Sequence, residues 1–362
     1  MEIKLNRMEF IKNIEKLATI AKENKIRPVL AGIKISVSDK ITLQATDLES
    51  TLVITMEGEI ISGGEVVIQY NEMIEYIKEL DDTEISIELQ DNMIYLQLQG
   101  SEISFSIYDV EEFPIINIKD SEEKIVINSD TLVRMINKSK ICFPVDISNL
   151  AIAGLKVIVK ENELIMGSTD TYRMVMYSED IETDKRLEMT IPMECVKNIE
   201  KYIKKHNGEL KIGLNGSTGI LEMGDSTFMF RLIDLAFPDI FGVDEGFNYV
   251  QKFSVNVLKM IPTLKRLKAI VKNNVEAKNS ATFLFGEKEL EIKAVSDKAR
   301  ATEKIKGIQG LEELKIGLNV DYILQFMNNA NIVEVYLNNA STVVKLQEEN
   351  YKYFIMPLAL RD

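Results

Sequence analysis

The residues of this chain whose pattern points to a chemical role are lysines and arginines, which recur at helical spacing. Segment 194–205 carries four lysines at positions i, i+4, i+7 and i+8, which form one face of a helix. Segment 255–272 carries cations and no acidic residue, and segment 129–140 repeats the i, i+4 spacing. No aromatic side chain is interleaved on these faces, so the pattern predicts attraction to phosphate groups rather than stacking on bases. The cations of these segments include Lys197, Lys201, Lys204, Lys205, Lys265, Arg266, Lys268, Lys272, Arg134 and Lys138.

The distribution of charge supports the same prediction. The chain of 362 residues has a net charge of −14, which by itself argues against a polyanionic partner. Four predicted helices, 7–25, 129–140, 194–205 and 255–272, nevertheless hold 17 basic and 6 acidic residues, whereas the rest of the chain holds 26 and 51. Positive charge is therefore segregated onto helices, with ordinary solvated helix faces as the alternative interpretation.

Three aspartates at matching positions are the other candidates for chemistry. Asp47, Asp170 and Asp297 each end a β-run after a small residue or Thr, which suits a side chain that fixes a turn better than a general base. An enzyme that acts on an acidic or phosphorylated substrate through Asp170 and Arg173 is the alternative. The only histidine, His206, lies in a polar helix end and is interpreted as a surface residue.

The common catalytic and metal-binding motifs are missing. The sequence has no GxSxG, GxxxxGK[ST], HExxH or EF-hand pattern, so we expect no catalytic residue, no cofactor and no metal site. Cys142 and Cys195 have no CxxC partner and are interpreted as buried free thiols. The N-terminus has no apolar signal core and no run approaches about 18 apolar residues, which predicts a soluble, cytoplasmic protein without a membrane partner.

One plan occurs three times along the chain. The three aspartates are 123 and 127 residues apart, and the same offsets separate three residues that each open an apolar helix after a β-run. Those residues are Gln69, Pro192 and Asn319. Two independent markers with matched offsets predict three tandem domains, with bounds 1–120, 121–245 and 246–362.

Each copy reads as a helix, strands, a second helix and further strands. Alternating apolar and polar residues predict half-buried antiparallel strands with helices on one face, so the fold class is α+β. Pro262, inside 255–272, is expected to kink or shorten that helix. Six half-copies joined end to end suggest an arc, and two identical arcs that close on each other would remove their open edge strands.

Short motifs follow one another along the whole chain: RPVLAGIKI and ATDLE in the first copy, AGLKV and STDTYRM in the second, then LAFPDIFGV and the terminal MPLAL. In this order, with the threefold repeat, the sequence resembles the bacterial DNA polymerase III β subunit family, the sliding clamps. The resemblance implies three DNA-clamp domains per chain. It also implies a head-to-tail homodimeric ring, with helices lining the hole and sheets outside.

The function that the resemblance implies is that of a processivity factor without catalytic activity. A diffuse positive field would hold duplex DNA without reading its sequence, and tethering would raise the effective concentration of polymerase at the primer end. Implied partners are double-stranded DNA, a second copy of the chain, the DNA polymerase III alpha subunit, the clamp loader and other proteins with a clamp-binding motif. The DNA-facing cations would be Arg7, Lys12, Arg134, Lys138, Lys197, Lys201, Lys204, Lys205, Lys265, Arg266 and Lys268.

In the family, partners insert a short peptide into an apolar cleft between the second and third domains. Carried over by motif, the cleft would comprise Ile152, Thr169, Thr171, Tyr172, Arg173, Met174, Pro238, Val243, Phe354, Met356, Pro357 and Leu358. Two features depart from the family pattern. Tyr172 stands where His is frequent, and Arg361-Asp362 extend past the usual terminal Leu.

The family's ring contact joins the first domain of one subunit to the third domain of the other. Ile103 and Phe105, facing Ile270 and Val271, are the candidates for it. A repeat scaffold that binds only proteins, with incidental helix charge, is a further alternative. A trimeric ring of the eukaryotic type fits less well, because that family has two domains per chain.

Overall fold

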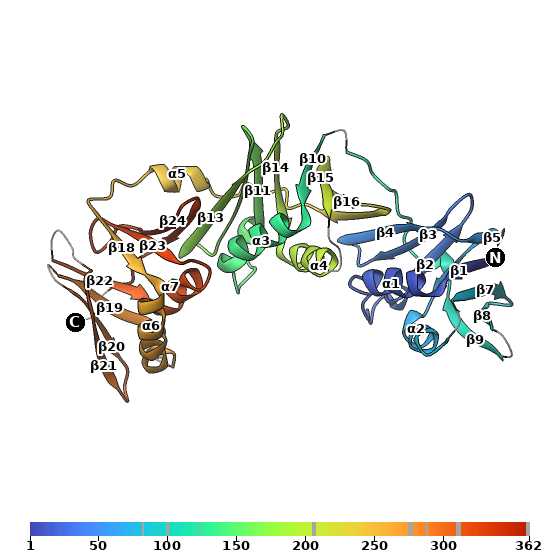
Figure 1. Cartoon of the computed structure of the whole chain (residues 1–362), viewed down its shortest axis with the longest axis horizontal. Coiled ribbons are helices and arrows are strands. Elements are labelled where there is room, and N and C mark those ends of the chain that lie inside the picture. Colours follow the sequence, from blue (N-terminus) through green and yellow to red (C-terminus); the bar gives the residue numbers. More distant parts are fainter. Residues whose placement is uncertain are drawn as a thin grey trace. The chain divides into compact units, whose positions relative to one another are not determined.

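The structure is a computed structural model that describes residues 1–81, 83–98, 101–121, 123–204, 208–273, 278–286, 289–308 and 313–359. The chain forms two compact units (Figure 1). Unit 1 contains Met1–Val133 and Ile191–Asp234, and unit 2 contains Arg134–Thr190 and Leu235–Asp362. The boundary falls within the middle copy of the repeat, so each unit combines one outer copy with about half of the middle one.

The first copy lies in unit 1, and each of its halves is a strand, a helix and three strands. The first half contains β1 (Glu2–Asn6), α1 (Arg7–Leu17), the 3-10 helix η1 (Pro28–Ala31), β2 (Ile33–Val37), β3 (Ile41–Thr46) and β4 (Ser50–Met56). The second half contains β6 (Gly64–Ile68), α2 (Tyr70–Lys78), β7 (Glu84–Gln90), β8 (Met93–Leu98) and β9 (Ser101–Tyr108), preceded by β5 (Glu59–Ser62) and followed by η2 (Val110–Glu112).

The middle copy repeats this order of elements. Its first half contains β10 (Lys124–Asn128), α3 (Ser129–Ser139), η3 (Lys140–Cys142), η4 (Leu150–Ile152), β11 (Gly154–Lys160), β12 (Glu163–Thr169) and β13 (Arg173–Asp180). Its second half contains β14 (Leu187–Pro192), α4 (Met193–Ile203), β15 (Glu209–Asn215), β16 (Thr218–Met223) and β17 (Ser226–Arg231).

The third copy lies in unit 2 and follows a linker that includes α5 (Ile240–Glu245). Its first half contains β18 (Gln251–Asn256), α6 (Val257–Val271), β19 (Ser280–Phe285), β20 (Glu289–Val295) and β21 (Arg300–Lys306). Its second half contains β22 (Leu314–Asn319), α7 (Val320–Met327), β23 (Ile332–Leu337), β24 (Val344–Glu348) and β25 (Tyr351–Ile355). The threefold α+β repeat predicted from the sequence is therefore present in the structure.

The strand that opens each copy was not predicted. β1, β10 and β18 all end in an asparagine that caps the following helix. The Oδ1 atoms of Asn6, Asn128 and Asn256 accept hydrogen bonds from helix N–H groups at 2.9–3.0 Å. An alternating run that ends in Asn directly before an apolar helix is a readable N-cap signal, and it occurs in all three copies.

The prediction of a helix over 7–25 is wrong at its C-terminal end. α1 stops at Leu17, whereas α3, α4 and α6 lie within one or two residues of their predicted bounds. The Thr19 hydroxyl donates to the carbonyl of Lys16 at 2.8 Å, and the N–H of Ile20 turns back to Leu17. This local bonding competes with the next helical turn and ends the helix.

Pro262 does not shorten α6, which continues for nine residues beyond it, to Val271. Its ring removes the N–H group that would bond the carbonyl of Leu258. Leu258 is 78% exposed, so that turn of the helix faces solvent and water can bond the carbonyl. Of the two expected outcomes, a shortened helix is therefore wrong, and a kink at Pro262 stays a prediction.

Two strand pairs join neighbouring copies. In unit 1, β4 pairs antiparallel with β17, and we call this pair the first junction. In unit 2, β13 pairs antiparallel with β25, and we call this pair the second junction. Over the described residues, the sheet of unit 1 has the order β10-β15-β16-β17-β4-β3-β2-β6-β9-β8-β7-β1-β5. The sheets of unit 2 have the orders β14-β11-β12-β13-β25-β24-β23-β18 and β21-β20-β19-β22.

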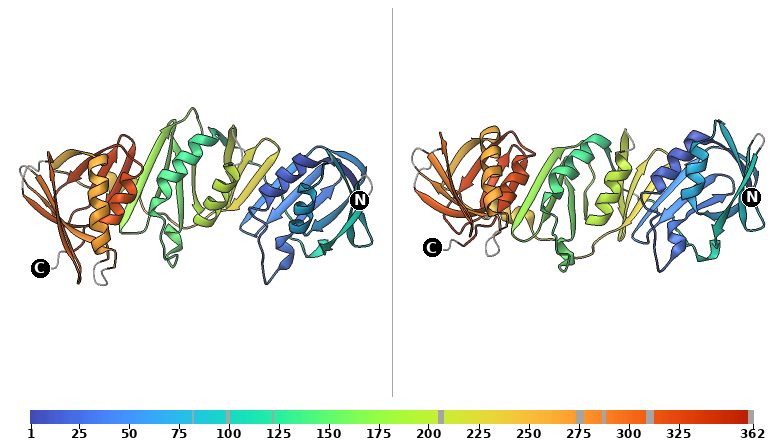
Figure 2. Two further views of the ribbon diagram at one scale, coloured as in Figure 1. Left: turned by 60° about the horizontal axis from the view of Figure 1, so that its bottom comes forward. Right: turned by 90° about the horizontal axis from the view of Figure 1, so that it is seen from below.

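Helices cover one face of these sheets in each unit (Figure 2). In unit 1, α1 packs against α2 and buries Phe10, Ile14 and Leu17 completely. In unit 2, α6 packs against α7 and buries Leu264 and Leu267 completely. The apolar stripes of the helices thus form the cores, which leaves their basic side chains on the opposite, uncovered face.

Candidate functional site

The turn between β12 and β13, which we call the second-junction loop (Thr169–Arg173), holds four of the predicted cleft residues together with Asp170. The Asp170 Oδ1 atom accepts hydrogen bonds from the N–H groups of Tyr172 and Arg173 at 3.1 and 3.0 Å. The Thr169 hydroxyl donates to the carbonyl of Arg173 at 2.8 Å. Thr171 has a φ of 74°, which a β-branched residue rarely adopts. Asp170 therefore fixes a turn, as the sequence predicted.

Arg173 is the most constrained side chain of this loop. It is only 8% exposed, and its Nε donates to the Asp170 Oδ2 atom at 2.8 Å. Its Nη1 donates to Gln325 at 2.6 Å and to the Tyr353 hydroxyl at 3.1 Å, and its guanidinium lies over the Tyr322 ring. Although burial alone would lower the pKa of Arg173, the surrounding Tyr353, Cys142 and Asp170 groups raise it above its usual value. Arg173 is a positioned cation that ties the loop to α7 and β25.

The C-terminal segment reaches the second-junction loop through β25. Arg173 pairs with Ile355 and Met174 with Phe354, and the N–H of Met356 donates to the carbonyl of Tyr172 at 2.8 Å. Met356 is 45% exposed and Tyr172 is 63% exposed. The structure thus brings the loop and the tail side by side, as the resemblance implied, with two large apolar side chains open to solvent.

An apolar cluster supports this surface from below. Met174 and Phe354 are buried with Ile240 in one cluster, and Val243 and Phe237 pack against it. The cluster places the start of α5 against β13 and β25. Pro238 is exposed in the linker directly before α5. A floor of buried side chains with an exposed rim is the usual construction of a peptide-binding cleft.

Two other predicted cleft residues have additional roles. Ile152 is 4% exposed at the end of η4, and its side chain belongs to the core of the middle copy. The N–H of Leu358 donates to the carbonyl of Gly317 on β22 at 2.8 Å, which ties the tail to the sheet of the third copy. Pro357, which lies between Met356 and Leu358 in the sequence, is half-buried. Arg361-Asp362 lie outside the described residues.

Several predicted DNA-facing cations already have partners within the chain. The structure pairs Arg134 with Glu179 at 2.9 Å, Lys197 with Glu194 at 2.5 Å, and Arg266 with Glu303 at 2.7 Å. Lys268 pairs with Asp321, Lys204 lies 3.9 Å from Glu200, and Lys138 lies over the rings of Tyr177 and Tyr351. Arg7 donates to the carbonyls of Ile77 and Lys78 at the end of α2. The ion pairs with carboxylates lower the positive charge that the helices offer to a polyanion.

The remaining cations are exposed on the helices. Lys12, Lys201 and Lys265 are exposed and stand on α1, α4 and α6. Lys205 and His206 lie outside the described residues. Burial and the neighbouring charge of Lys12 lower the pKa of Lys16 to about 8. This buried lysine therefore loses its positive charge as the pH rises above about 8.

The residues predicted for a contact between subunits divide into two groups. Ile103 and Phe105 are half-buried on β9, where Phe105 packs edge-on against Tyr76. Ile270 is half-buried, but Val271 is fully buried in its own copy, so its side chain cannot contribute to a surface. The assignment of Val271 is therefore wrong, because the last turn of α6 points this residue into the core.

The residues that hold Arg173 were missed by sequence analysis. Tyr322 and Gln325 come from α7, and Tyr353 from β25, more than 140 positions away from the loop. Nothing in their local sequence distinguishes them from ordinary core or helix residues. The sequence offered only an arginine within STDTYRM, and its burial, which demands several acceptors, is seen in the structure alone.

The two cysteines are buried free thiols, as predicted. Burial raises the pKa of the Cys142 thiol far above its usual value and that of Cys195 to about 11, so both are protonated and unreactive at neutral pH. None of the helices in the described part of the chain combines the length and the apolar composition that crossing a bilayer requires.

Comparison with known proteins relates this chain to one family. Residues 1–117 match the family model of the DNA polymerase III beta subunit, N-terminal domain, and residues 126–239 match that of the central domain. The beta sliding clamp of Haemophilus influenzae is 22% identical over 99% of this chain and 100% of its own length. The beta sliding clamp of Rickettsia bellii is 23% identical over 94% of each chain.

Solved structures share the fold along the whole chain. The DNA polymerase III subunit beta from Pseudomonas aeruginosa superposes with a TM-score of 0.90 at 20% identity, covering 99% of this chain and 100% of that one. The DNA polymerase sliding clamp from Bacillus subtilis superposes with a TM-score of 0.88 at 19% identity, covering all of both chains. The architecture is therefore the clamp fold, although most side chains differ.

Proposed function

The chain belongs to the DNA polymerase III beta subunit family, and from this premise we propose that it is a sliding clamp. It encircles duplex DNA as a head-to-tail dimer and tethers the replicative polymerase, without catalytic activity of its own. Its three clamp domains are 1–120, 121–245 and 246–362. The partners would be double-stranded DNA, a second copy of the chain, the polymerase alpha subunit and the clamp loader. The compartment would be the cytoplasm.

The observation that carries the proposal is a pairing rule between consecutive copies. The third strand after the first helix of one copy pairs with the last strand of the next copy: β4 with β17, and β13 with β25. The corresponding strand of the third copy is β21, which is an edge strand within the described part of the chain. If the rule continues, the partner of β21 is the last strand of a first copy, β9, in a second chain.

Strand β9 is suited to accept such a partner. Over Ser101–Ser106 it pairs with β8 only, because its contact with β6 is limited to Tyr108 and Ile107 in the described residues. Ile103 and Phe105 project from this open stretch on one face. Two open edges that complete each other by the rule already used twice would close a ring of two chains. This argument assigns β21, rather than Val271, as the partner of β9.

The basic helix faces support the role of duplex DNA as the cargo. Lys12 on α1, Lys201 on α4 and Lys265 on α6 place one exposed cation on a helix of each copy. Point charges on flexible stems attract phosphates without reading base edges, which permits sliding. Intrachain ion pairs, such as that of Arg266 with Glu303, would moderate the strength of this attraction.

The oligomeric state is the first test. Multi-angle light scattering at micromolar concentration should give twice the mass of one chain for the native protein, and one mass for Ile103→Lys, because a charge on the open edge opposes pairing. Ile61→Lys is the matched control. Ile61 is 45% exposed on β5, the last strand in the order of the same sheet, and its variant should remain dimeric. A strictly monomeric native protein would contradict the proposal.

Topological linkage to DNA is the second test. Loading with a clamp loader onto a nicked circular plasmid should leave protein bound in high salt until the circle is linearised, since a ring slides off ends. A scaffold that binds only proteins would not become linked. An enzyme that works through Asp170 and Arg173 would instead show turnover that Asp170→Asn abolishes.

The peptide cleft has its own test. Deletion of residues 356–362 removes Met356 and the tail from the second junction. Binding of a fluorescent peptide from the polymerase alpha subunit should fall by at least about tenfold, which is roughly 1.4 kcal/mol. The dimer should persist, because the tail is remote in sequence from β9 and β21. Unchanged peptide binding would refute this cleft.

A further inference from the structure

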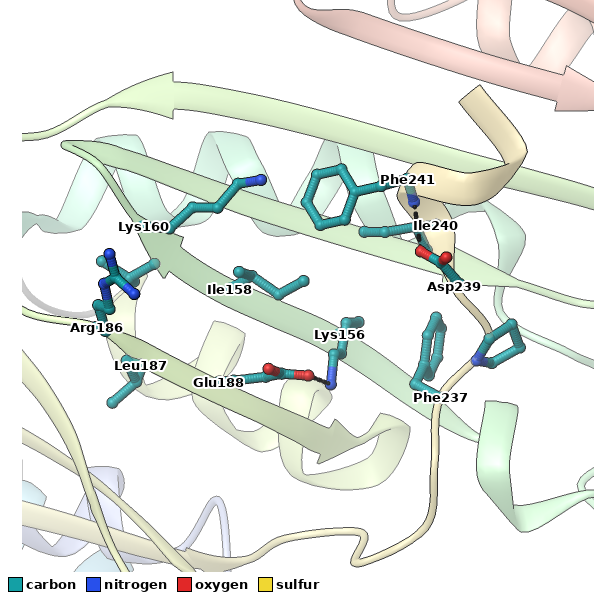
Figure 3. A pocket seen from close by; sticks show the side chains of 12 residues that line it. Lys156, Ile158, Lys160, Arg186, Leu187, Glu188, Phe237, Asp239, Ile240 and Phe241 are labelled. Carbon is teal, nitrogen blue, oxygen red and sulfur yellow. Dashed lines mark hydrogen bonds and ion pairs between the residues drawn. The ribbon is translucent and has the colours of Figure 1, made fainter. Parts of the chain in front are cut away.

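A pocket separate from the tail and its loop lies on the outer side of β11 in unit 2 (Figure 3). It has a volume of about 620 Å³ and lies between β11, β14 and the linker segment 237–241. Figure 3 shows Arg186 at one end of the pocket and Phe237 with Asp239 at the other. No residue of the second-junction loop or of the tail lines it, and Pro238 is the one predicted cleft residue that it shares.

The floor of the pocket is apolar. Ile158 projects from β11 between Lys156 and Lys160, and Phe237, Ile240 and Phe241 close the opposite wall. Ile240 is 2% exposed, whereas Ile158, Phe237 and Phe241 are half-buried. The pocket therefore offers aliphatic and aromatic surface that the chain itself leaves partly uncovered.

The charges around the floor are not equivalent. Lys156 is neutralised by Glu188 at 2.6 Å, and the Asp239 carboxylate accepts from the N–H groups of Phe241 and Gly242 as the cap of α5. Lys160 lies 3.8 Å from the centre of the Phe241 ring, and Arg186 is exposed. Lys160 and Arg186 are thus the cations that remain for a ligand.

We propose that this pocket binds an acidic peptide segment of a partner protein in which a carboxylate neighbours an aliphatic or aromatic side chain. The apolar side chain packs on Ile158 and Phe237, and the carboxylate pairs with Lys160 or Arg186. A nucleic acid fits less well, because a phosphate backbone offers no apolar side chain to pack on Ile158 and Phe237. The site is a second docking point beyond the cleft of the proposed function.

The linker gives this pocket a connection with the cleft. Ile240 is buried in the same cluster as Met174 and Phe354, while Phe237 and Phe241 pack at its edge. One partner chain can therefore contact both surfaces along a short path, which would add the affinity of the second contact to the first. The pocket would select partners whose clamp-binding segment is flanked by acidic residues.

The test uses the full-length protein and a fluorescein-labelled peptide of sequence DELFDD, followed by fluorescence anisotropy. Binding should weaken as salt rises, and Lys160→Glu and Arg186→Glu should each lower the affinity on the order of tenfold, because each replaces attraction with repulsion. Lys185→Glu is the matched control. Lys185 is the neighbour of Arg186, is not part of the pocket lining and lies 3.9 Å from Asp184, so its variant should bind within about twofold of the native protein.

Further arms separate the alternatives. Ile158→Ser should weaken DELFDD binding, and the charge-reversed peptide KKLFKK should not bind. Equal losses of DELFDD affinity in Lys185→Glu and Arg186→Glu would show that binding depends only on the total charge of this surface, and would overturn the proposal. Absence of DELFDD binding, displacement of the peptide by a short oligo-dT, or loss of binding on deletion of residues 356–362 would overturn it as well, the last by assigning the peptide to the cleft.

Discussion

The first and second junctions have the same backbone conformation and differ in the contacts that their side chains make. In the loop that precedes β4, which we call the first-junction loop (Thr46–Ser50), Asp47 accepts from the N–H groups of Glu49 and Ser50. The Thr46 hydroxyl donates to the carbonyl of Ser50 at 3.0 Å. The second-junction loop has the same bonds at corresponding positions. A backbone hydrogen bond to the loop is also repeated. The N–H of Arg231, at the end of β17, donates to the carbonyl of Glu49, as the N–H of Met356, just after β25, donates to the carbonyl of Tyr172.

The two loops also share a strained residue. Leu48 has a φ of 77° and Thr171 a φ of 74°. Both occupy the third position of their loop, where the chain must turn sharply between the two strands. The same hydrogen bonds and a closely similar φ in unlike sequences indicate that this turn is a structural feature of the joint between copies.

What distinguishes the second junction is the group after the turn and the freedom of the tail. Within the described part of the chain, the Ser50 hydroxyl contacts only the Cys195 sulfur, at 3.4 Å, whereas the Arg173 side chain at the same position makes an ion pair and two further hydrogen bonds. At the first junction the chain continues from β17 into the linker that contains α5. At the second, β25 is followed by Met356, exposed beside the loop. The comparison teaches that two joints with the same backbone differ in their side chains, and that only the second has the side chains of a candidate binding site.

The largest expected difference between the junctions is in stability. Arg173→Ala leaves Asp170 partly buried without its cation, and it should lower the free energy of unfolding of unit 2 by about 3–5 kcal/mol. Ser50→Ala should lower that of unit 1 by about 1 kcal/mol or less, because it removes one weak contact. Urea unfolding followed by circular dichroism measures both. Arg173→Lys should recover only part of the loss, since lysine lacks the planar fork. Similar losses at both positions would break the comparison.

A middle-sized difference is expected for the two aspartates. Asp170→Asn keeps an oxygen for the loop N–H groups but removes the ion pair of Arg173, at a cost of about 2–3 kcal/mol. Asp47→Asn loses no ion pair, since its Oδ2 atom contacts Asn198 at 3.4 Å, and should cost about 1 kcal/mol. The same unfolding measurement applies. A larger cost for Asp47→Asn than for Asp170→Asn would contradict the assigned role of Arg173.

The smallest effect should be equal at the two junctions. Thr171→Gly and Leu48→Gly relieve the left-handed strain of about 1–2 kcal/mol, against a chain-entropy cost of about 0.5–1 kcal/mol, so each should stabilise slightly. Thr171→Ala serves as control, because alanine keeps the Cβ atom that causes the strain. Thermal unfolding scans resolve such shifts. Opposite signs for the two glycine variants would show that the loops are not equivalent.

The third copy marks the limit of the repeat. The alignment of Asp297 with Asp47 and Asp170 predicted the same turn, but here the Ser296 side chain bonds with the backbone of Ala299 and organises a turn that is one residue longer. This turn precedes β21, which has no neighbour of the next copy within the described residues to accept a bridge. The loop therefore differs where the junction is missing, which supports the view that the Asp-centred turn serves to join copies.

Much of the fold was predictable because its signals are local. Alternating strands, amphipathic helices and matched offsets depend on residues a few positions apart, and they gave the α+β class and the threefold repeat. The extent of α1 was overestimated, since Thr19 competes for a helix carbonyl through a contact that periodicity does not reveal. The motif STDTYRM identified the loop of the cleft, but the residues that hold Arg173 come from distant elements.

By itself, the sequence determined the elements, their repetition and the segregation of basic residues onto helices, because these follow from side-chain type and spacing along one chain. The tertiary structure alone decided which strands pair between copies, which cations keep a free charge and which side chains enclose Arg173. Those outcomes depend on contacts between residues more than 100 positions apart, such as Arg173 with Tyr353. No local pattern encodes such contacts, since only closure of the fold brings their partners together.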